Sequence, residues 1–98
     1  MTSRYHNDIR KDAVRKFQED NLYFALLYID EAIGSVNESS LAHQHYYQDK
    51  EYFIYSIIEK SIYDDESTAY FSDILRQTQI KMEHFEYPLM RGNVIYFV

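Results

Sequence analysis

The residue types that most often carry chemistry are sparse in this sequence and poorly spaced for it. There is no cysteine, which excludes thiolate nucleophiles, thiolate metal ligands and disulfides. His43 and His45 are the closest pair of histidines, but two ligands on one helix face need a spacing of three or four residues. A spacing of two turns the rings to different sides of a helix. The sequence therefore predicts no metal site and no cofactor.

Other catalytic patterns are also missing. No serine lies in a G-x-S-x-G nucleophile elbow, and Gly34 and Gly92 are too far apart for a phosphate-binding glycine loop. The adjacent acids Asp64 and Asp65 lie in a segment that reads as a turn, where acids stabilise the start of the next helix. We therefore expect no catalytic residues and a protein that is not an enzyme.

The composition favours a small soluble helical domain. The chain has 98 residues with 46% apolar and 17% aromatic content, enough for one domain with a core. Two glycines and one proline are too few for the many turns of an all-β fold. The longest apolar run, residues 22–29, is far shorter than the roughly 20 residues of a membrane-spanning helix. We expect no membrane span and, with no secretory signal and no cysteine, a cytoplasmic location.

Helical periodicity predicts an all-α fold, a small antiparallel bundle of about four helices in a single domain over residues 1–98, with an extended apolar C-terminal tail. Short loops between the helices favour antiparallel neighbours. The expected elements are helices at about 3–20, 22–34, 36–63 and 66–86, followed by the tail at 87–98.

Helix ends are predicted from capping patterns. Ser35 followed by Glu38 is a candidate capping box for the third helix, and Asp65 or Ser67 is expected to cap the fourth. The polar triplet at residues 49–51 interrupts the apolar pattern of the third helix. Whether that helix continues through the triplet is left open by the pattern.

Two apolar segments exceed what a simple amphipathic helix needs. Residues 22–29 are apolar on every side, so the outer face at Tyr23 and Leu27 belongs either to the core or to an interface. The tail ends in the apolar segment 93–98, which includes Ile95 and Phe97. This segment either packs on its own bundle or pairs with a strand of another chain.

Residues 13–33 form a helix–turn–helix pattern with small residues at regular positions. The segment resembles a single tetratricopeptide repeat, whose second helix carries small, large and small residues where this chain has Ala25, Ile29 and Ala32. The family's glycine and tyrosine on the first helix are replaced by Ala13 and Lys16. The resemblance covers about a fifth of the chain, and no second copy follows. It implies a tight helical hairpin and favours protein–protein interaction.

Charge is distributed unevenly along the chain. Residues 1–16 have a net charge of +3, from five basic and two acidic residues, whereas the rest has −9, from five basic and fourteen acidic residues. Arg4, Lys11 and Arg15 on the first helix are candidate phosphate contacts of a nucleotide- or nucleic-acid-binding module. The acidic body supports a second alternative, a DNA-mimicking inhibitor of a nucleic-acid enzyme.

The surplus of tyrosines leads to the main functional hypothesis. Tyrosine is favoured at interfaces because it buries a large area while few torsions are frozen. We expect a small non-enzymatic inhibitor or adaptor that binds another protein and forms a homo-oligomer. In type it resembles small phage- or mobile-element-encoded inhibitors and accessory factors. The expected interface residues are Tyr23, Leu27, Tyr46, Tyr47, Tyr52, Tyr55, Tyr63, Asp64, Asp65, Glu66, Ile95 and Phe97.

Overall fold

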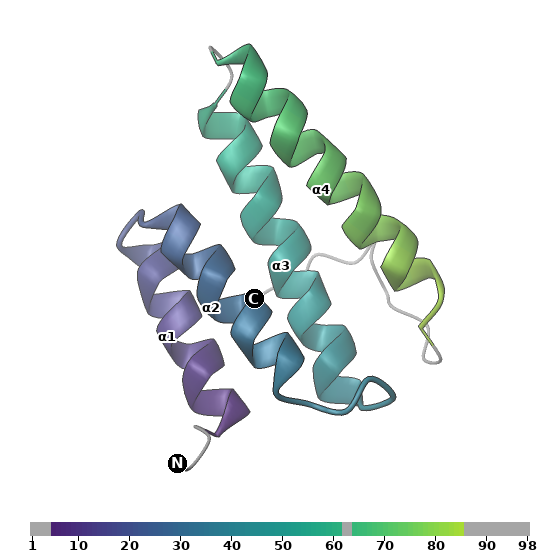
Figure 1. Ribbon diagram of the computed structural model, residues 1–98. Coiled ribbons are helices and arrows are strands. Elements are labelled where there is room, and N and C mark those ends of the chain that lie inside the picture. The colour runs from purple at the N-terminus through teal and green to yellow at the C-terminus, as the bar shows by residue number, and fades with distance from the viewer. Residues whose placement is uncertain (1–4, 62–63, 86–98) are drawn as a thin grey trace.

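The protein is an all-α array of four helices, which confirms the predicted fold class (Figure 1). The computed structural model describes residues 5–61 and 64–85. The helices are α1 (His6–Gln18), α2 (Leu22–Gly34), α3 (Leu41–Lys60) and α4 (Asp65–Glu83). The predicted tail and the candidate residues Arg4, Tyr63, Ile95 and Phe97 lie outside the described residues.

Consecutive helices run in opposite directions and pack as neighbours (Figure 1). α1 packs on α2, α2 packs on α3, and α3 packs on α4, so α3 lies between the N-terminal hairpin and α4. Short connections make each successive pair an antiparallel hairpin. The arrangement leaves the outward side of α2 uncovered by the other described helices.

Alanines allow α1 and α2 to approach closely. Ala13, Ala25 and Ala32 are completely buried in one cluster with Ile9 and Ile29. Small side chains at a helix crossing bring the two backbones together and let the larger isoleucines fill the space beside them. The observed hairpin has the small residues that the sequence pattern placed on these two helices.

The turn between α1 and α2 needs a residue in the left-handed region. Asp20 has a φ of 63°, and the backbone N–H groups of Asp20 and Asn21 donate to the carbonyls of Phe17 and Lys16. These two bonds form a Schellman motif, whose left-handed position is usually occupied by glycine. Aspartate tolerates this conformation better than most residues, and its carboxylate here also pairs with Lys60 of α3.

α3 buries two faces at once. Phe53 joins the cluster of the α1–α2 hairpin, where its ring stacks on Phe17 with centroids 4.8 Å apart. Ile54 and Ile57 belong to a second cluster that also contains Leu22 of α2 and Phe71 of α4. Burying a large apolar side chain contributes about 1.5–3 kcal/mol. The two clusters therefore hold α3 against the α1–α2 hairpin on one side and against α4 on the other.

α3 continues through the polar triplet at residues 49–51. Each of the three side chains has a partner on a different helix. Successive residues on a helix are turned by about 100°, so the three side chains leave α3 in three directions. The contacts are Arg10 Nε of α1 to Asp49 Oδ2 at 3.0 Å, Lys50 Nζ to Asp30 Oδ1 of α2 at 2.8 Å, and Gln79 Nε2 of α4 to Glu51 Oε2 at 3.0 Å.

One predicted helix start is wrong. α3 begins at Leu41, not near residue 36, and Ser40 caps it by accepting a backbone N–H at 3.1 Å. The expected capping box at Ser35 does not form. Asn37 instead accepts the backbone N–H of Ser39 at 2.9 Å, a local turn that competes with helix formation.

The cap of α4 is Asp64 and neither of the two predicted residues. Its extended backbone places the carboxylate over the first turn, where it accepts the backbone N–H of Ser67 at 3.2 Å and the hydroxyl at 2.8 Å. These hydrogen bonds hold the pKa of the Asp64 carboxyl below its ordinary value. The remaining helix ends differ from the predictions by three residues or fewer, since α1 spans 6–18 and α2 spans 22–34.

The left-handed turn predicts how Asp20 responds to substitution. Asp20→Ala and Asp20→Gly both remove the pair with Lys60, so they differ mainly in the Cβ atom that strains a positive φ. We expect Asp20→Ala to lower the free energy of unfolding by about 1 kcal/mol relative to Asp20→Gly. Urea denaturation of the two variants measures this difference. Equal stability would show that the turn tolerates a Cβ without cost.

Candidate partner-binding surface

α2 is buried on one side and apolar on the other. Its inner residues pack in the core, whereas Tyr23, Phe24 and Leu27 are exposed by 59, 52 and 65%. These three residues are called the α2 outer face below. The sequence pattern had left open whether Tyr23 and Leu27 belong to the core or to an interface, and it did not single out Phe24. The structure shows that the other described helices do not cover these three residues.

Aromatic rings extend this surface to α4. The ring of Tyr23 lies 5.6 Å from that of Phe71, and Tyr70 meets Phe71 edge-on at 5.0 Å. Tyr70 is 63% exposed. Phe71 itself is buried and contacts both Tyr23 and Tyr70, so it lies beneath the surface between the two tyrosines. Tyr70 is not among the interface residues that the sequence pattern predicts. Its proximity to Tyr23 depends on how α2 and α4 both pack on α3.

The next turn of α2 is acidic. Glu31 is exposed and follows Leu27 by four residues and Phe24 by seven, which places it on the same side of the helix. Asp30 pairs with Lys50 of α3. No basic residue occurs in α2. An apolar patch on the first two turns is therefore followed by a negative charge.

The predicted tyrosines of α3 do not form one surface. Tyr52 and Tyr55 are half exposed, but the ring of Tyr52 lies 5.3 Å from that of Phe17, and the Tyr55 hydroxyl accepts an amide N–H from Gln79 at 3.1 Å. Tyr47 is partly buried between the rings of His43 and Phe85. Each of the three has a partner within the molecule, on a different side of α3.

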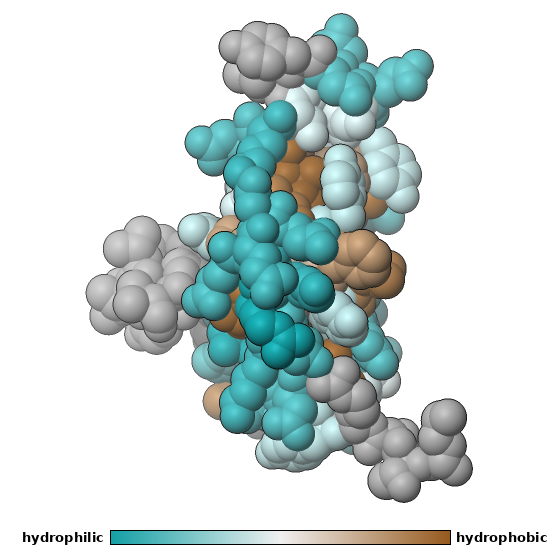
Figure 2. All heavy atoms as spheres, turned by 90° about the vertical axis from the view of Figure 1, so that its left-hand side faces the viewer, coloured by the Kyte–Doolittle hydropathy of each residue, from teal (hydrophilic) through white to brown (hydrophobic). Residues whose placement is uncertain are grey.

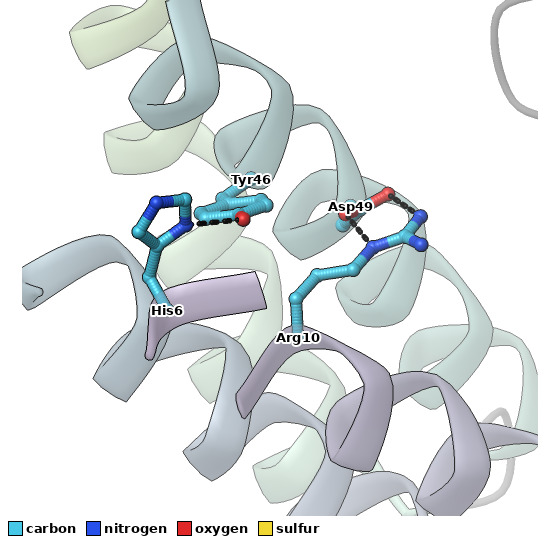
Figure 3. A network of polar contacts seen from close by, with 4 residues as sticks. All are labelled: His6, Arg10, Tyr46 and Asp49. Carbon is cyan, nitrogen blue, oxygen red and sulfur yellow. Dashed lines mark hydrogen bonds and ion pairs between the residues drawn. The ribbon is translucent and has the colours of Figure 1, made fainter. Parts of the chain in front are cut away.

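Tyr46 is buried, with only 6% of its surface exposed, so it is not part of the candidate surface as predicted. Its hydroxyl lies 2.7 Å from Nδ1 of His6, and one turn along both helices Arg10 forms a two-pronged contact with Asp49 (Figure 3). Burial is the main cause that raises the pKa of the Tyr46 hydroxyl. This network fastens α1 to α3, so its aromatic and basic members serve the fold.

The first helix shows mixed charge. Figure 2 views the molecule from the side of α1 and shows a face covered mainly by hydrophilic side chains. Lys11 and Arg15 are exposed there, but Arg15 pairs with Asp12 at 2.9 Å and Arg10 is held by Asp49. Acids thus offset much of the positive charge that the alternative phosphate-binding hypothesis needs.

The acidic turn before α4 is accessible. Asp64, Asp65 and Glu66 are all exposed. The Asp64 carboxylate is engaged in capping, which leaves the other two as the candidates for contact with a partner. Both project from the first turn of the helix that also carries Tyr70.

The histidines behave as their spacing predicts for a helix. His43 is buried, whereas His45 is exposed. Within residues 5–61 and 64–85, no group of three His, Cys, Asp or Glu side chains is arranged to hold a metal ion. No helix in the described part of the chain has the length and apolar character needed to cross a membrane.

Comparison with known proteins adds no relative. No family model matches the sequence, and neither a curated protein nor a solved structure matches it.

The Asp49 carboxyl predicts a pH dependence of stability. Burial raises its pKa above the ordinary value of 3.8, although Arg10 acts in the opposite direction. Between the ordinary value and the raised one, the folded state binds more protons than the unfolded state, so Asp49 makes the free energy of unfolding fall as pH rises. Asp49→Asn removes this contribution.

Denaturation of the wild type and Asp49→Asn at a series of acidic pH values isolates the effect. We expect the stability of the wild type relative to the variant to fall as pH rises from below 3.8. A difference that instead grows with pH would mean that the ion pair with Arg10 outweighs burial.

Proposed function

We propose that the protein is a small non-enzymatic adaptor or inhibitor that binds an amphipathic helix of another protein on the α2 outer face. The observation that carries the proposal is the exposure of Tyr23, Phe24 and Leu27 on a helix whose opposite side is fully buried. Full burial of a large apolar side chain contributes about 1.5–3 kcal/mol. In the isolated protein these side chains stay in contact with water, and a partner that covered them would gain this free energy on binding.

A helix is the partner element that suits this geometry. Leu27 follows Phe24 by three residues and Tyr23 by four, which are the spacings by which one helix packs against another. Tyr23 and Tyr70 add side chains of the type enriched at the centres of protein interfaces. An amphipathic helix laid along α2 would cover Leu27 and reach Tyr70 beyond Phe71.

Charge favours a basic flank on that partner. The apolar patch is followed by Glu31, α2 has no basic residue, and the whole chain has a net charge of −6. Opposite charge at the rim speeds encounter and fixes the register of a complex. A second copy of the chain, the occupant expected for a homo-oligomer, would add another acidic flank. We therefore favour a different protein.

The area available supports a transient complex. Three aromatic or aliphatic side chains that are half to two-thirds exposed offer roughly 300–400 Å². A stable interface of standard size uses about 800 Å² per partner. The α2 outer face is thus the centre of an interface that Tyr70 and polar neighbours would have to complete. The small size resembles that of phage- or mobile-element-encoded inhibitors, and a chain without cysteine suits a reducing cytoplasm.

A designed peptide tests the proposal. A helical peptide with leucines on one face and lysines on the other should bind the wild type, as measured by fluorescence polarisation. Leu27→Asp should weaken this binding by about tenfold, or ~1.4 kcal/mol, because it places a charge in the apolar patch. Leu41→Asp is the matched control, because Leu41 is also exposed but lies at the start of α3.

The sign of the effect separates docking from simple charge attraction. If the peptide only followed the negative charge of the protein, Leu27→Asp and Leu41→Asp would both strengthen binding. Light scattering of the unmodified protein tests the other occupant. A dimer that Leu27→Asp dissociates and Leu41→Asp leaves intact would assign the face to a second copy and overturn the proposal of a different partner.

A further inference from the structure

A second candidate site lies at the opposite end of α4 from Tyr70. It is a pocket of about 400 Å³ between the start of α3 and the end of α4. This volume is within the range of about 300–1,000 Å³ that small-molecule sites occupy. The pocket shares no residue with the α2 outer face. Its lining consists of Glu38, Ser39, His43, Lys81, His84 and Phe85.

His43 contributes a buried ring whose Nδ1 has no partner. The residue is 3% exposed, and its ring lies 5.0 Å from that of Tyr47 and 5.7 Å from that of Phe85. Nδ1 is sealed from solvent and forms no hydrogen bond. A proton on Nδ1 would bury a donor without an acceptor, which is costly. We therefore assign the proton to Nε2, and the Nε2 edge of the ring is the one left to face the pocket.

Two charged side chains of opposite sign, Lys81 and Glu38, are among the described residues that line this pocket. Lys81 lines it and also lines an adjoining pocket of about 210 Å³ that contains Lys50 and Tyr47. Lys50 is paired with Asp30, whereas Lys81 has no ion pair among the described residues. His84, just beyond α4, adds an exposed imidazole.

The start of α3 adds to this field. His43 lies in the first turn of α3, whose backbone N–H groups make that end of the helix partly positive. Ser40 satisfies only the N–H of His43. The helix end and the Nε2–H of the buried ring therefore act on the same pocket as Lys81. Among the described residues, Glu38 supplies the carboxylate that lines the pocket.

We propose that this pocket binds a small phosphate monoester, with the phosphate between Lys81, His84 and the Nε2–H of His43, and the organic group against the ring of Phe85. Three donors of this kind suit the acceptor oxygens of a phosphate. The aromatic ring at the rim gives an organic group a surface on which to stack. Glu38 is exposed and opposes the phosphate, so the site would bind more tightly without its charge.

Electrostatics make the His43 ring a reporter of occupancy. Burial is the main cause that lowers its pKa from the ordinary 6.5, with Glu38 acting to raise it and Lys81 to lower it. Because the charges of Lys81 and Glu38 offset each other, a phosphate dianion would be the largest new charge beside the ring. It would raise the pKa of His43 and would itself bind more tightly as pH falls towards the second phosphate pKa of about 6.

The test is an NMR titration of the histidine side chains with inorganic phosphate and with phenyl phosphate. We expect saturable shifts of the His43 resonance, a raised pKa for His43 in the complex, and tighter binding of phenyl phosphate. Lys81→Ala should weaken binding at least about tenfold, because it removes a charged donor. Glu38→Gln should strengthen it, and Arg76→Ala, which removes an exposed base of α4 that does not line the pocket, should leave it unchanged.

The three variants alter exposed side chains, so folding does not confound the comparison. Shifts that never saturate, or that Lys81→Ala and Arg76→Ala reduce equally, would mean non-specific attraction and overturn the site. Equal binding of inorganic phosphate and phenyl phosphate would overturn the stacking of an organic group and leave an adventitious ion only.

Discussion

The polar triplet of Asp49, Lys50 and Glu51 determines how the other helices are placed around α3. Each side chain points to a different neighbour, and each contact is partly shielded from water. A polar group that is removed from water costs free energy unless it keeps its partner. Rotating or sliding any one helix would separate one of these pairs. The apolar clusters make the array stable, and the triplet restricts it to one arrangement.

This division of roles explains why the binding surface is separate from the fold. The inner side of α2 supplies the alanines and isoleucines of the core, and Asp30 ties the helix to α3. Nothing in these contacts requires an apolar residue at Tyr23, Phe24 or Leu27. A polar side chain at Phe24 or Leu27 would satisfy the described helices equally well, whereas the ring of Tyr23 also contacts Phe71. The apolar character of Phe24 and Leu27 is therefore a property that the described helices do not explain and a partner would.

Local patterns were sufficient for the parts of the fold that depend on local physics. The period of apolar residues predicted four helices, and the alanines at 13, 25 and 32 are at the close approach of the first two. Capping was predicted less well, because Ser35 and Ser40 are equally good caps in isolation. The side chain of Asn37, which closes a turn on Ser39, decides between them.

Contacts between distant residues account for most of what the pattern missed. The charges at 49–51 read as a break because their partners are 20 to 39 residues away in the chain. Tyr46 and Tyr52 are the same residue type on one helix, yet only the first is buried. Both contact α1, Tyr46 through His6 and Tyr52 through Phe17, so the pattern does not distinguish them. The contact of His43 with Phe85 could not be predicted either, since Phe85 lies beyond the end of α4.

Three polar contacts that join the α1 helix and its following turn to α3 have almost the same sequence separation. His6 with Tyr46, Arg10 with Asp49, and Asp20 with Lys60 are 40, 39 and 40 residues apart. A constant offset means that α1 and α3 run parallel and meet in a single register. Most of the remaining packing joins helices that are consecutive in the chain, and α2 also contacts α4 through Tyr23 and Phe71. Packing between consecutive helices keeps contact order low, which is the condition under which small helical domains fold fastest. The register between α1 and α3 is then the main arrangement that distant parts of the chain have to find.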